Sequence, residues 1–469
     1  MNIKLFNTLG RKVQDFIPIE EGKAGMYACG PTVYNFAHIG NLRTYVFEDL
    51  LRRMFEYFGY SVTHVMNITD VGHLTDDADE GEDKMIVGAR QRKMTVWEIA
   101  DFFSNAFFTD LKKLNIEQPN VTCKATEHIQ DMIDLISRLE KNGNTYSAGG
   151  NIYFDISTFK DYGRLALLDN QELLAGARTG IDENKKHPHD FALWFTRSKF
   201  EHQAMQWESP WGRGYPGWHV ECSAMSMKYL GEHFDIHLGG IDHIPVHHTN
   251  EIAQSEAATG KPWVNYWIHG EFLIMEKGKM AKSAGNFLTL KSLEDSGYDP
   301  LDFRYLCLGG HYRSQLQFSE EALSGARSAR LNCVDRLKEV VSRAETDEKK
   351  PLSEKGRGYR ASFEEHIARD LNIPRALADV WGILKEPDIS YSEKADLILS
   401  MDTVLGLKLK ESVQTSGSIS QEQMKLIKER EEARKNKDFK RADEIRELLH
   451  KGGIEIKDTP EGTRWKITK

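Results

Sequence analysis

The chain has 469 residues, too many for a single hydrophobic core, so we expect two to four domains. Apolar residues make up 40% and charged residues 28%, as in a globular protein in water. The sequence contains no run of 18 apolar residues, so we do not expect a membrane span. The N-terminus lacks the apolar stretch of a signal peptide. Five scattered cysteines without a CxxC pair exclude a disulfide framework and lead us to expect a reducing, cytoplasmic location. The net charge of −9 gives no indication of nucleic-acid binding, although a local basic surface would suffice.

A strand–loop–helix–strand unit is expected near the N-terminus. Residues 26–28 are typical of a short strand running into a Gly-Pro loop. Apolar residues four apart then predict an amphipathic helix that ends near Gly59: Leu42, Val46, Leu50, Met54 and Phe58. The β-branched stretch SVTHVMNITD predicts the next strand. This βαβ unit predicts an α/β fold with a Rossmann-like parallel sheet that binds ligands at the carboxyl ends of its strands.

The remaining chain divides by pattern. Residues from about 115 to 210 mix helical patterns with turns and are expected to form an insertion. HFDIHLGG and NYWIHGEFLIM then predict the second half of the sheet, and beyond residue 320 the pattern is almost wholly helical. Polar stretches at 344–358 and 411–423 are the predicted linkers.

Two stretches are candidates for phosphate binding. His38-Ile39-Gly40-Asn41 lies where the first loop enters the first helix, a place that attracts phosphates through unpaired backbone N–H groups and the positive helix end. Lys279 and Lys282 lie in a glycine-rich loop, EKGKMAKSAGNF. Taken singly, each stretch has an ordinary explanation: a loop histidine with a helix-capping asparagine, and a solvated surface loop.

A metal site is a second possibility. His247 and Glu251 are four apart in GGIDHIPVHHTNEIAQSE, so on a helix they share one face. With Cys29 and Cys222 they would make a mixed sulfur, nitrogen and oxygen set that zinc accepts in tetrahedral geometry. Lone cysteines are more often small buried hydrophobes, and the spacing alone does not decide between the two.

The two candidate phosphate stretches together resemble the paired signatures of class I aminoacyl-tRNA synthetases, conventionally HIGH and KMSKS. Here they are HIGN and KMAKS, about 240 residues apart and in the same order. The resemblance implies that His38, Gly40, Asn41, Lys279 and Lys282 bind ATP, with Mg²⁺ on its phosphates. Asn41 can still donate a hydrogen bond, and Ala281 leaves both lysines in place, so we expect these departures to affect ATP affinity rather than the reaction.

Longer segments resemble the cysteinyl-tRNA synthetase family: YACGPTVYNFAHIGNLRTYVFEDLLRR, GARTGIDENKKHPHDFALWF, GYPGWHVECSAM, HFDIHLGGIDHIPVHHTNEIAQSEA, FRYLCLGGHYRSQLQFSEEAL and RKNKDFKRADEIRELLHKGGIEIKDTPEGTRW. The resemblance implies one zinc ion per chain, held by Cys29, Cys222, His247 and Glu251, with His243 and His248 outside the ligand set. It implies that the substrate cysteine binds beside the zinc ligand Cys29, in a pocket lined by Thr69, Trp218 and Asp242. His219 and His237 would help to position the adenylate.

Chemistry gives such a zinc ion a purpose. Serine differs from cysteine by one atom, and shape alone separates near-isosteres by only about 10- to 200-fold. Zinc binds a thiolate strongly and an alcohol poorly, so a substrate thiolate bound to zinc would exclude serine at the binding step. The family resemblance agrees and implies no separate editing domain.

The resemblance extends to the C-terminus. Residues 421–469 hold 14 Lys and Arg against 11 Asp and Glu, on a chain that is acidic overall. A charge-rich helix is often only a solvated face, but the resemblance implies that Arg434, Asp443 and Arg446 read anticodon bases. The expected partners are cysteine tRNA, L-cysteine and ATP, and a monomer is expected.

The domain limits that follow are 1–115 and 211–275 for the two halves of the catalytic domain, 116–210 for the insertion, 276–330 for the lysine loop and stem-contact region, 331–415 for a helical bundle, and 420–469 for an anticodon-binding domain.

Three alternatives remain. An enzyme of mycothiol synthesis that joins cysteine to an amino sugar resembles the same catalytic half but lacks the tail. A zinc-structured RNA-binding protein would not need the lysine loop. A zinc hydrolase would need an HExxH arrangement, which this chain lacks.

Overall fold

The structure is a computed structural model that describes residues 2–72, 92–168, 183–197, 205–275, 278–279, 288–344, 347, 351–414, 421–436, 438–451, 454–459 and 462–467. The predicted ATP-binding residue Lys282 lies outside these residues, and of Lys279 only the backbone is described. No helix among the described residues is long and apolar enough to cross a lipid bilayer.

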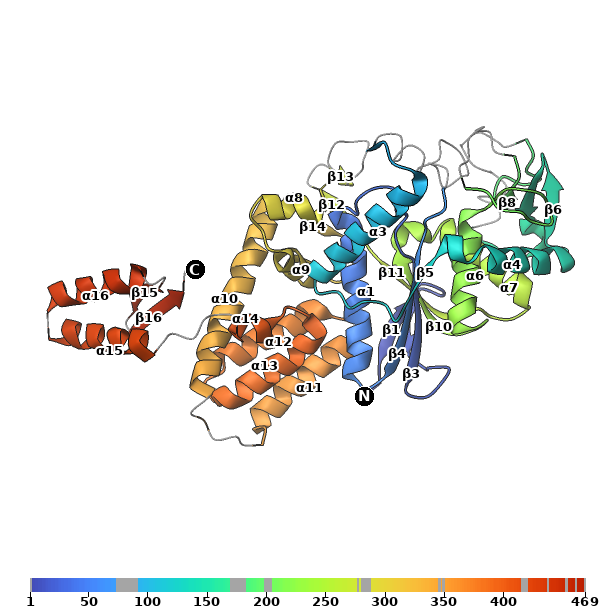
Figure 1. Cartoon of the computed structure of the whole chain (residues 1–469). Helices are drawn as coiled ribbons and strands as arrows, with labels where there is room; N and C mark the ends of the chain where they lie inside the picture. The colour runs from blue at the N-terminus through green and yellow to red at the C-terminus, as the bar shows by residue number, and fades with distance from the viewer. Residues whose placement is uncertain are drawn as a thin grey trace.

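A five-stranded parallel sheet forms the centre of the chain, as expected from the βαβ pattern (Figure 1). Its strand order is β11-β10-β3-β4-β5, so the two halves of the sheet meet where β10 pairs with β3. The strands are β3 (Lys23–Ala28), β4 (Ser61–Ile68), β5 (Val121–Lys124), β10 (Phe234–Gly240) and β11 (Val264–Gly270). Parallel strands carry ligands at their carboxyl ends, and here that edge bears Cys29, Thr69 and the loop after Gly240.

Alternate side chains of the sheet enter two separate cores. Met26 and Ala28 face the core that contains helix α1 (Ile39–Tyr57), whereas Tyr27 and Cys29 face the core beneath α4 (Ile129–Lys141), α6 (Trp218–Leu230) and α7 (His247–Thr259). This is the two-residue period of a strand that is covered on both sides. The face toward α6 and α7 carries the candidate metal ligands.

The expected insertion contains three strands of an antiparallel sheet, β6-β7-β8-β9, at the far right of Figure 1, and the fourth strand, β9, lies beyond its predicted end at residue 210. Its strands are β6 (Thr145–Ala148), β7 (Asn151–Phe154), β8 (Phe191–Phe195) and β9 (Tyr215–Pro216). Short 3₁₀ turns lie at η1 (Ala125–Glu127), η2 (Ile156–Thr158) and η3 (Ile241–His243). The N-terminal hairpin is β1 (Lys4–Asn7) with β2 (Lys12–Asp15), and α3 (Val96–Lys113) starts at a capping box of Thr95 and Glu98.

A smaller sheet and a helical bundle follow the central sheet. The sheet has the order β13-β12-β14, formed by β12 (Leu273–Met275), β13 (Gly278–Lys279) and β14 (Leu316–Phe318). The helices are α8 (Leu290–Asp295), α9 (Pro300–Leu308), α10 (Glu320–Ala344), α11 (Glu354–Ala368), α12 (Ile373–Lys385), α13 (Tyr391–Leu405) and α14 (Leu409–Gln414). The bundle packs against α1, so the helix that starts at HIGN is enclosed between the sheet and the bundle (Figure 1).

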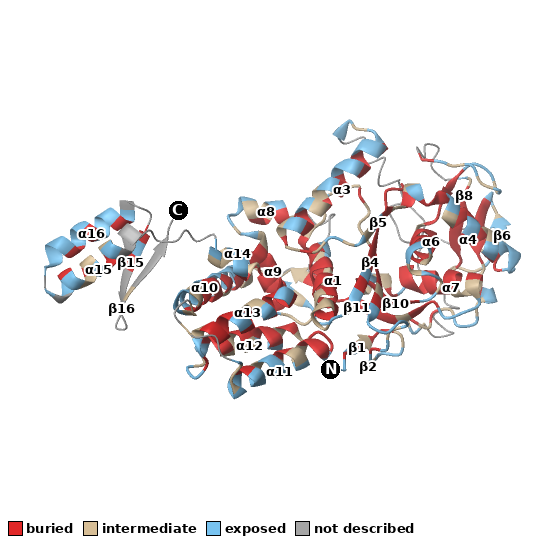
Figure 2. Cartoon of the chain, turned by 60° about the horizontal axis from the view of Figure 1, so that its bottom comes forward, coloured by how far each residue is buried: buried red, intermediate tan, exposed pale blue. Residues whose placement is uncertain are grey.

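The C-terminal unit lies apart from the rest of the chain in both views (Figures 1 and 2). It consists of α15 (Gln421–Lys435), α16 (Phe439–Lys451) and a hairpin of β15 (Ile454–Thr459) with β16 (Gly462–Ile467), around a small core of its own. The helical pattern predicted beyond residue 320 is therefore incomplete, because the chain ends in this hairpin. The predicted linkers are also too long, since α11 begins at Glu354, α14 extends to Gln414 and α15 begins at Gln421. The domain limits stay a prediction.

Candidate metal and nucleotide site

The four predicted metal ligands converge beside the carboxyl ends of β3 and β10. Cys29 directly follows β3, Cys222 lies on α6, and His247 and Glu251 lie one turn apart on α7. One ligand atom from each of the four lies within 4.8 Å of every other, and all four side chains are buried. The Sγ atoms of Cys29 and Cys222 are 3.9 Å apart. Two sulfur ligands at about 2.3 Å from one tetrahedral ion would be about 3.8 Å apart, so the spacing fits a shared metal ion.

Glu251 supplies the strongest test of fit. Its Oε1 lies 2.7 Å from Nε2 of His247 in an ion pair, yet this fully buried oxygen accepts no hydrogen bond from the described residues. A buried carboxylate oxygen is costly unless a cation faces it; protonated His247 is that cation in the metal-free chain, and a bound metal ion would take its place. The Nε2 and Oε1 atoms of this pair, together with the two cysteine sulfurs, form a donor set suited to a soft divalent ion.

The electrostatics of the pair agree with a cation site. Burial works against ionisation of Glu251, but the imidazoles of His247 and His237 outweigh it and lower its pKa to about 2. Burial also lowers the pKa of His247, but the Glu251 carboxylate outweighs burial and raises it to about 10. A bound cation would take the place of the His247 proton, so metal binding here releases a proton.

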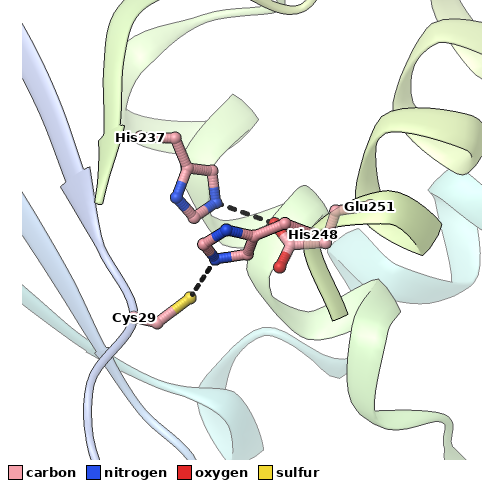
Figure 3. A group of neighbouring side chains, drawn as sticks. All are labelled: Cys29, His237, His248 and Glu251. Atoms are coloured by element: carbon pink, nitrogen blue, oxygen red, sulfur yellow. Dashed lines mark hydrogen bonds and ion pairs between the residues drawn. The ribbon is translucent and has the colours of Figure 1, made fainter. Parts of the chain in front are cut away.

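Two further histidines hold the ligands in place. His237 Nε2 lies 2.8 Å from Oε2 of Glu251, which Figure 3 shows as a dashed line, and the His237 ring is stacked on Trp267. His219 Nδ1 lies 3.0 Å from Nδ1 of His247. If Nε2 of His247 binds the ion, its Nδ1–H donates to His219, which fixes the tautomer and the ring orientation. The prediction that His219 and His237 contact the adenylate stays a prediction.

A second set of four residues overlaps the first. Cys29, His237, His248 and Glu251 also bring one ligand atom each within 4.8 Å (Figure 3). Both sets share Cys29 and Glu251, so they describe one site with two choices of partner. Nε2 of His237 contacts Glu251 and Nε2 of His248 contacts Cys29 within this set, just as Nε2 of His247 contacts Glu251 in the predicted one. These contacts do not choose between the two sets, and the predicted ligand set stays a prediction.

The start of α1 is built as a closed cap. His38 is the N-cap residue, and its Nδ1 accepts a hydrogen bond from the backbone N–H of Asn41, whose side chain accepts in turn from the His38 N–H. The proton of a neutral His38 ring is therefore on Nε2, which makes that atom a donor suited to a phosphate oxygen. A Cβ at Gly40 would lie 2.9 Å from the His38 ring, so this glycine is required by the cap itself. The ordinary explanation of Asn41 as a capping residue is correct, and it does not exclude ligand binding.

The lysine loop begins and ends beside this cap. Strand β13 pairs Lys279 with Ile274, and nine residues later the Leu288 carbonyl accepts the backbone N–H of Ile39 at 2.9 Å. Thr289 forms an isolated bridge with His38. Since the N–H groups of Ile39 and Asn41 are both used internally, the predicted phosphate site depends on side chains more than on unpaired backbone donors.

Of the predicted cysteine-pocket residues, Trp218 contacts a predicted metal ligand. The ring of Trp218 packs on His247, with centroids 4.4 Å apart. Thr69 follows β4 and is buried, and its hydroxyl accepts a hydrogen bond from the Asn67 side chain. Asp242 is exposed in the η3 turn, two residues after β10. Thr69 and Asp242 come from the carboxyl-end edge of the central sheet, and Trp218 is the first residue of α6.

Comparison with known proteins identifies the family. A model of the class I tRNA synthetase (C) catalytic domain matches residues 15–328, and a model of the cysteinyl-tRNA ligase anticodon binding domain matches residues 416–465. The chain belongs to the cysteinyl-tRNA ligase family. Curated cysteine–tRNA ligases from Treponema denticola, Borreliella burgdorferi and Treponema pallidum are 55%, 46% and 45% identical to it, each over 99% of this chain and 100% of the relative.

Solved structures of other class I synthetases share the fold. A methionyl-tRNA synthetase from Mycobacterium tuberculosis in complex with methionyl-adenylate has a TM-score of 0.58 at 15% identity, over 83% of this chain and 91% of that one. A leucyl enzyme from Agrobacterium radiobacter, solved as a ternary complex with tRNA, has a TM-score of 0.60 at 11% identity, over 86% and 87% of the two chains. The predicted Rossmann-like fold class is confirmed.

The residues predicted to read the anticodon lie in the C-terminal unit. Asp443 and Arg446 are exposed and three apart on α16, and Arg434 is exposed near the end of α15 (Figure 2). Their contacts with tRNA stay a prediction.

Sequence reasoning missed several residues of the site. Tyr27 lies on the same strand face as Cys29, and burial together with Cys222 and the other nearby cysteines raises its pKa well above the usual value. The two-residue strand period could have indicated Tyr27. His269 contacts His248, and Thr8 contacts His269 in turn. Neither residue belongs to a sequence motif that would have indicated this contact.

Proposed function

We propose that this chain activates L-cysteine with ATP, forming cysteinyl-adenylate and pyrophosphate, and then transfers cysteine to the 3′ end of cysteine tRNA with release of AMP. Membership of the cysteinyl-tRNA ligase family supports the proposal. The observation that carries it is the convergence of Cys29, Cys222, His247 and Glu251, all four buried, in one cluster.

Zinc is the ion proposed for this cluster, one per chain. Two thiolates, an imidazole and a carboxylate are ligands that zinc takes in tetrahedral sites. When bound, zinc would accept the substrate thiolate as a further ligand, which serine cannot supply. The protein residues then do the rest of the selection: Trp218 would close one wall of the pocket, and Thr69 and Asp242 would hold the amino acid by its polar groups.

ATP would bind between the start of α1 and the lysine loop. The Nε2–H of His38 and the side chain of Asn41 would contact phosphate oxygens, and Lys279 and Lys282 would supply positive charge, with Mg²⁺ on the phosphates. The reaction needs no covalent enzyme nucleophile, because the cysteine carboxylate attacks the α-phosphate directly. These residues would therefore act by orientation and by stabilising the charge that develops on phosphate.

The transfer step would use the C-terminal unit. The terminal adenosine hydroxyl of the tRNA attacks the adenylate carbonyl, and residues Arg434, Asp443 and Arg446 would recognise anticodon bases at a distance. The match of residues 416–465 to the anticodon-binding model favours tRNA over an amino sugar as acceptor.

ATP–pyrophosphate exchange with each amino acid in turn tests the proposal. Exchange should depend on cysteine, and the ratio of kcat/KM for cysteine over serine should exceed the roughly 200-fold that shape alone provides. A ratio below about 200 would contradict metal-based selection, and exchange with another amino acid in preference to cysteine would contradict the proposed substrate. Charging of cysteine tRNA but not of an amino-sugar acceptor distinguishes the two ligase activities.

A further inference from the structure

A chain of buried hydrogen bonds leads from the N-terminal hairpin to the metal cluster. Thr8 Oγ1 lies 2.7 Å from Nδ1 of His269, and Nε2 of His269 lies 2.7 Å from Nδ1 of His248. Nε2 of His248 then lies 3.4 Å from Sγ of Cys29, a contact drawn in Figure 3. The four residues are no more than 6% exposed, and they come from the turn after β1, from β11, from α7 and from the loop after β3.

The direction of this chain is fixed by its cysteine end, because the Thr8 hydroxyl at the other end can donate or accept. Each nitrogen–nitrogen contact holds one proton, so if one ring nitrogen of a neutral histidine donates, the other must accept. A cysteine that binds a metal is a thiolate, which can only accept. The His248 Nε2–H must then donate to Cys29, His248 Nδ1 must accept from His269 Nε2–H, and His269 Nδ1 must accept from the Thr8 hydroxyl.

We propose that Thr8 and His269 are positioning residues that complete the hydrogen-bond chain behind His248, so that its Nε2–H is held on the metal-bound thiolate of Cys29. The inference rests on the proposed function, since it takes Cys29 as a metal ligand. A hydrogen bond to the sulfur fixes its position and withdraws charge from it, which leaves the metal more able to accept the substrate thiolate. His248 is then a support of the site and not one of its ligands, although it belongs to the second overlapping set.

The Thr8 hydroxyl supports this direction because it supplies the one donor that the chain needs from outside the two rings, and without it neither tautomer of His269 has a partner at position 8. Without it, His269 Nδ1 would be a buried acceptor with no donor from position 8. Moving the ring proton of His269 to Nδ1 would make its Nε2 an acceptor, and His248 would then donate from Nδ1. The lone pair of His248 Nε2 would face the thiolate, and the two would repel each other.

Two variants separate this role from simple packing. Thr8→Val keeps the shape of the side chain and removes the hydroxyl, and Thr8→Ser keeps the hydroxyl. The Thr8 side chain bonds to His269 and not to a predicted metal ligand. Zinc affinity is measured by competition with a chromogenic chelator, and the thiolate-to-metal charge-transfer band is recorded in the cobalt(II)-substituted protein. We expect Thr8→Val to bind zinc about 10-fold more weakly, at the lower end of the usual effect of such outer residues, and to shift the band. Thr8→Ser should match the unsubstituted protein in both.

Equal zinc affinity and an identical band in Thr8→Val and Thr8→Ser would overturn the inference. A second measurement uses the unsubstituted zinc-loaded protein, in which ¹⁵N NMR of labelled histidines reports the tautomers. His248 and His269 should both carry their protons on Nε2, and a proton on Nδ1 of His248 would overturn the inference whatever the variants do. If the unsubstituted protein binds no zinc and gives no charge-transfer band, the metal proposal itself fails, which is a different result from an intact site that ignores Thr8.

Discussion

Arg304 on α9 donates a hydrogen bond to Asp49 on α1 at 2.6 Å, and both side chains are fully buried. Asp49 also accepts from Arg53 on its own helix, and Arg304 donates to the carbonyls of Leu114 and Leu405. This arrangement joins the helix that carries the HIGN cap to the helical bundle. Asp49 therefore helps to hold the helix behind the predicted nucleotide site against the bundle.

Asp49→Asn should destabilise the protein strongly, because it leaves the guanidinium of Arg304 buried without its anion. Removing one partner of a buried pair costs about 3–5 kcal/mol. Glu56→Gln on the same helix is the matched control, since Glu56 pairs with Arg52 and is about one-third exposed, and it should cost less than about 1 kcal/mol. Urea unfolding of the two variants measures both values, and equal losses would contradict the role assigned to Asp49.

Glu251→Gln should impair metal binding while leaving the fold intact. The change removes the carboxylate charge that faces His247 and the two cysteines, so we expect zinc affinity to fall by more than about 100-fold. Glu256→Gln lies on the same helix but pairs with Arg164, and it should retain about one zinc per chain. Metal analysis after gel filtration makes the comparison, and full zinc content in Glu251→Gln would show that the carboxylate is not a ligand.

Local sequence patterns predicted some parts of this site, whereas contacts between residues far apart in the sequence were not predictable from such patterns. The βαβ unit was predictable because the apolar period of α1 extends over several turns, and His247 and Glu251 were placed on one helix face by their spacing. Cys29 and Cys222 came from family resemblance, since 193 residues separate them. The contacts of His248 with His269 and Thr8 were not predictable, because only the folded sheet brings these residues together. The C-terminal hairpin was missed because its strands are short and follow a charged helical pattern.

Arg446→Ala should weaken discrimination between a cysteine tRNA and an anticodon-altered version by about 1–3 kcal/mol, if the side chain contacts a base edge. Arg441→Ala on the same helix is the control, because its guanidinium is already paired with Glu429 and Glu444. Charging kinetics with both tRNAs give the discrimination, and pyrophosphate exchange without tRNA should be unchanged in either variant. If Arg446→Ala charges both tRNAs with the ratio of the unsubstituted protein, this residue does not read the anticodon.

His64 should make the protein less stable in mild acid. Burial lowers its pKa to about 3, with Arg52 adding to the effect, against about 6.5 in an unfolded chain. Below pH 6.5 the unfolded chain binds a proton that the folded protein does not, so the free energy of unfolding decreases as the pH is lowered. Between pH 7.5 and 5.5 the loss from this residue is about 1.4 kcal/mol. His64→Leu should lose that much less than the unsubstituted protein in urea unfolding at the two pH values, and parallel losses would contradict the assignment.

Zinc K-edge X-ray absorption, with and without the amino acid, tests the central claim most directly. The zinc-loaded protein should show two sulfur ligands at about 2.3 Å with nitrogen and oxygen ligands at about 2.0–2.2 Å. Addition of cysteine should raise the sulfur count by one, and addition of serine should leave it unchanged. A ligand shell that does not change when cysteine is added would contradict selection of the substrate through its thiolate.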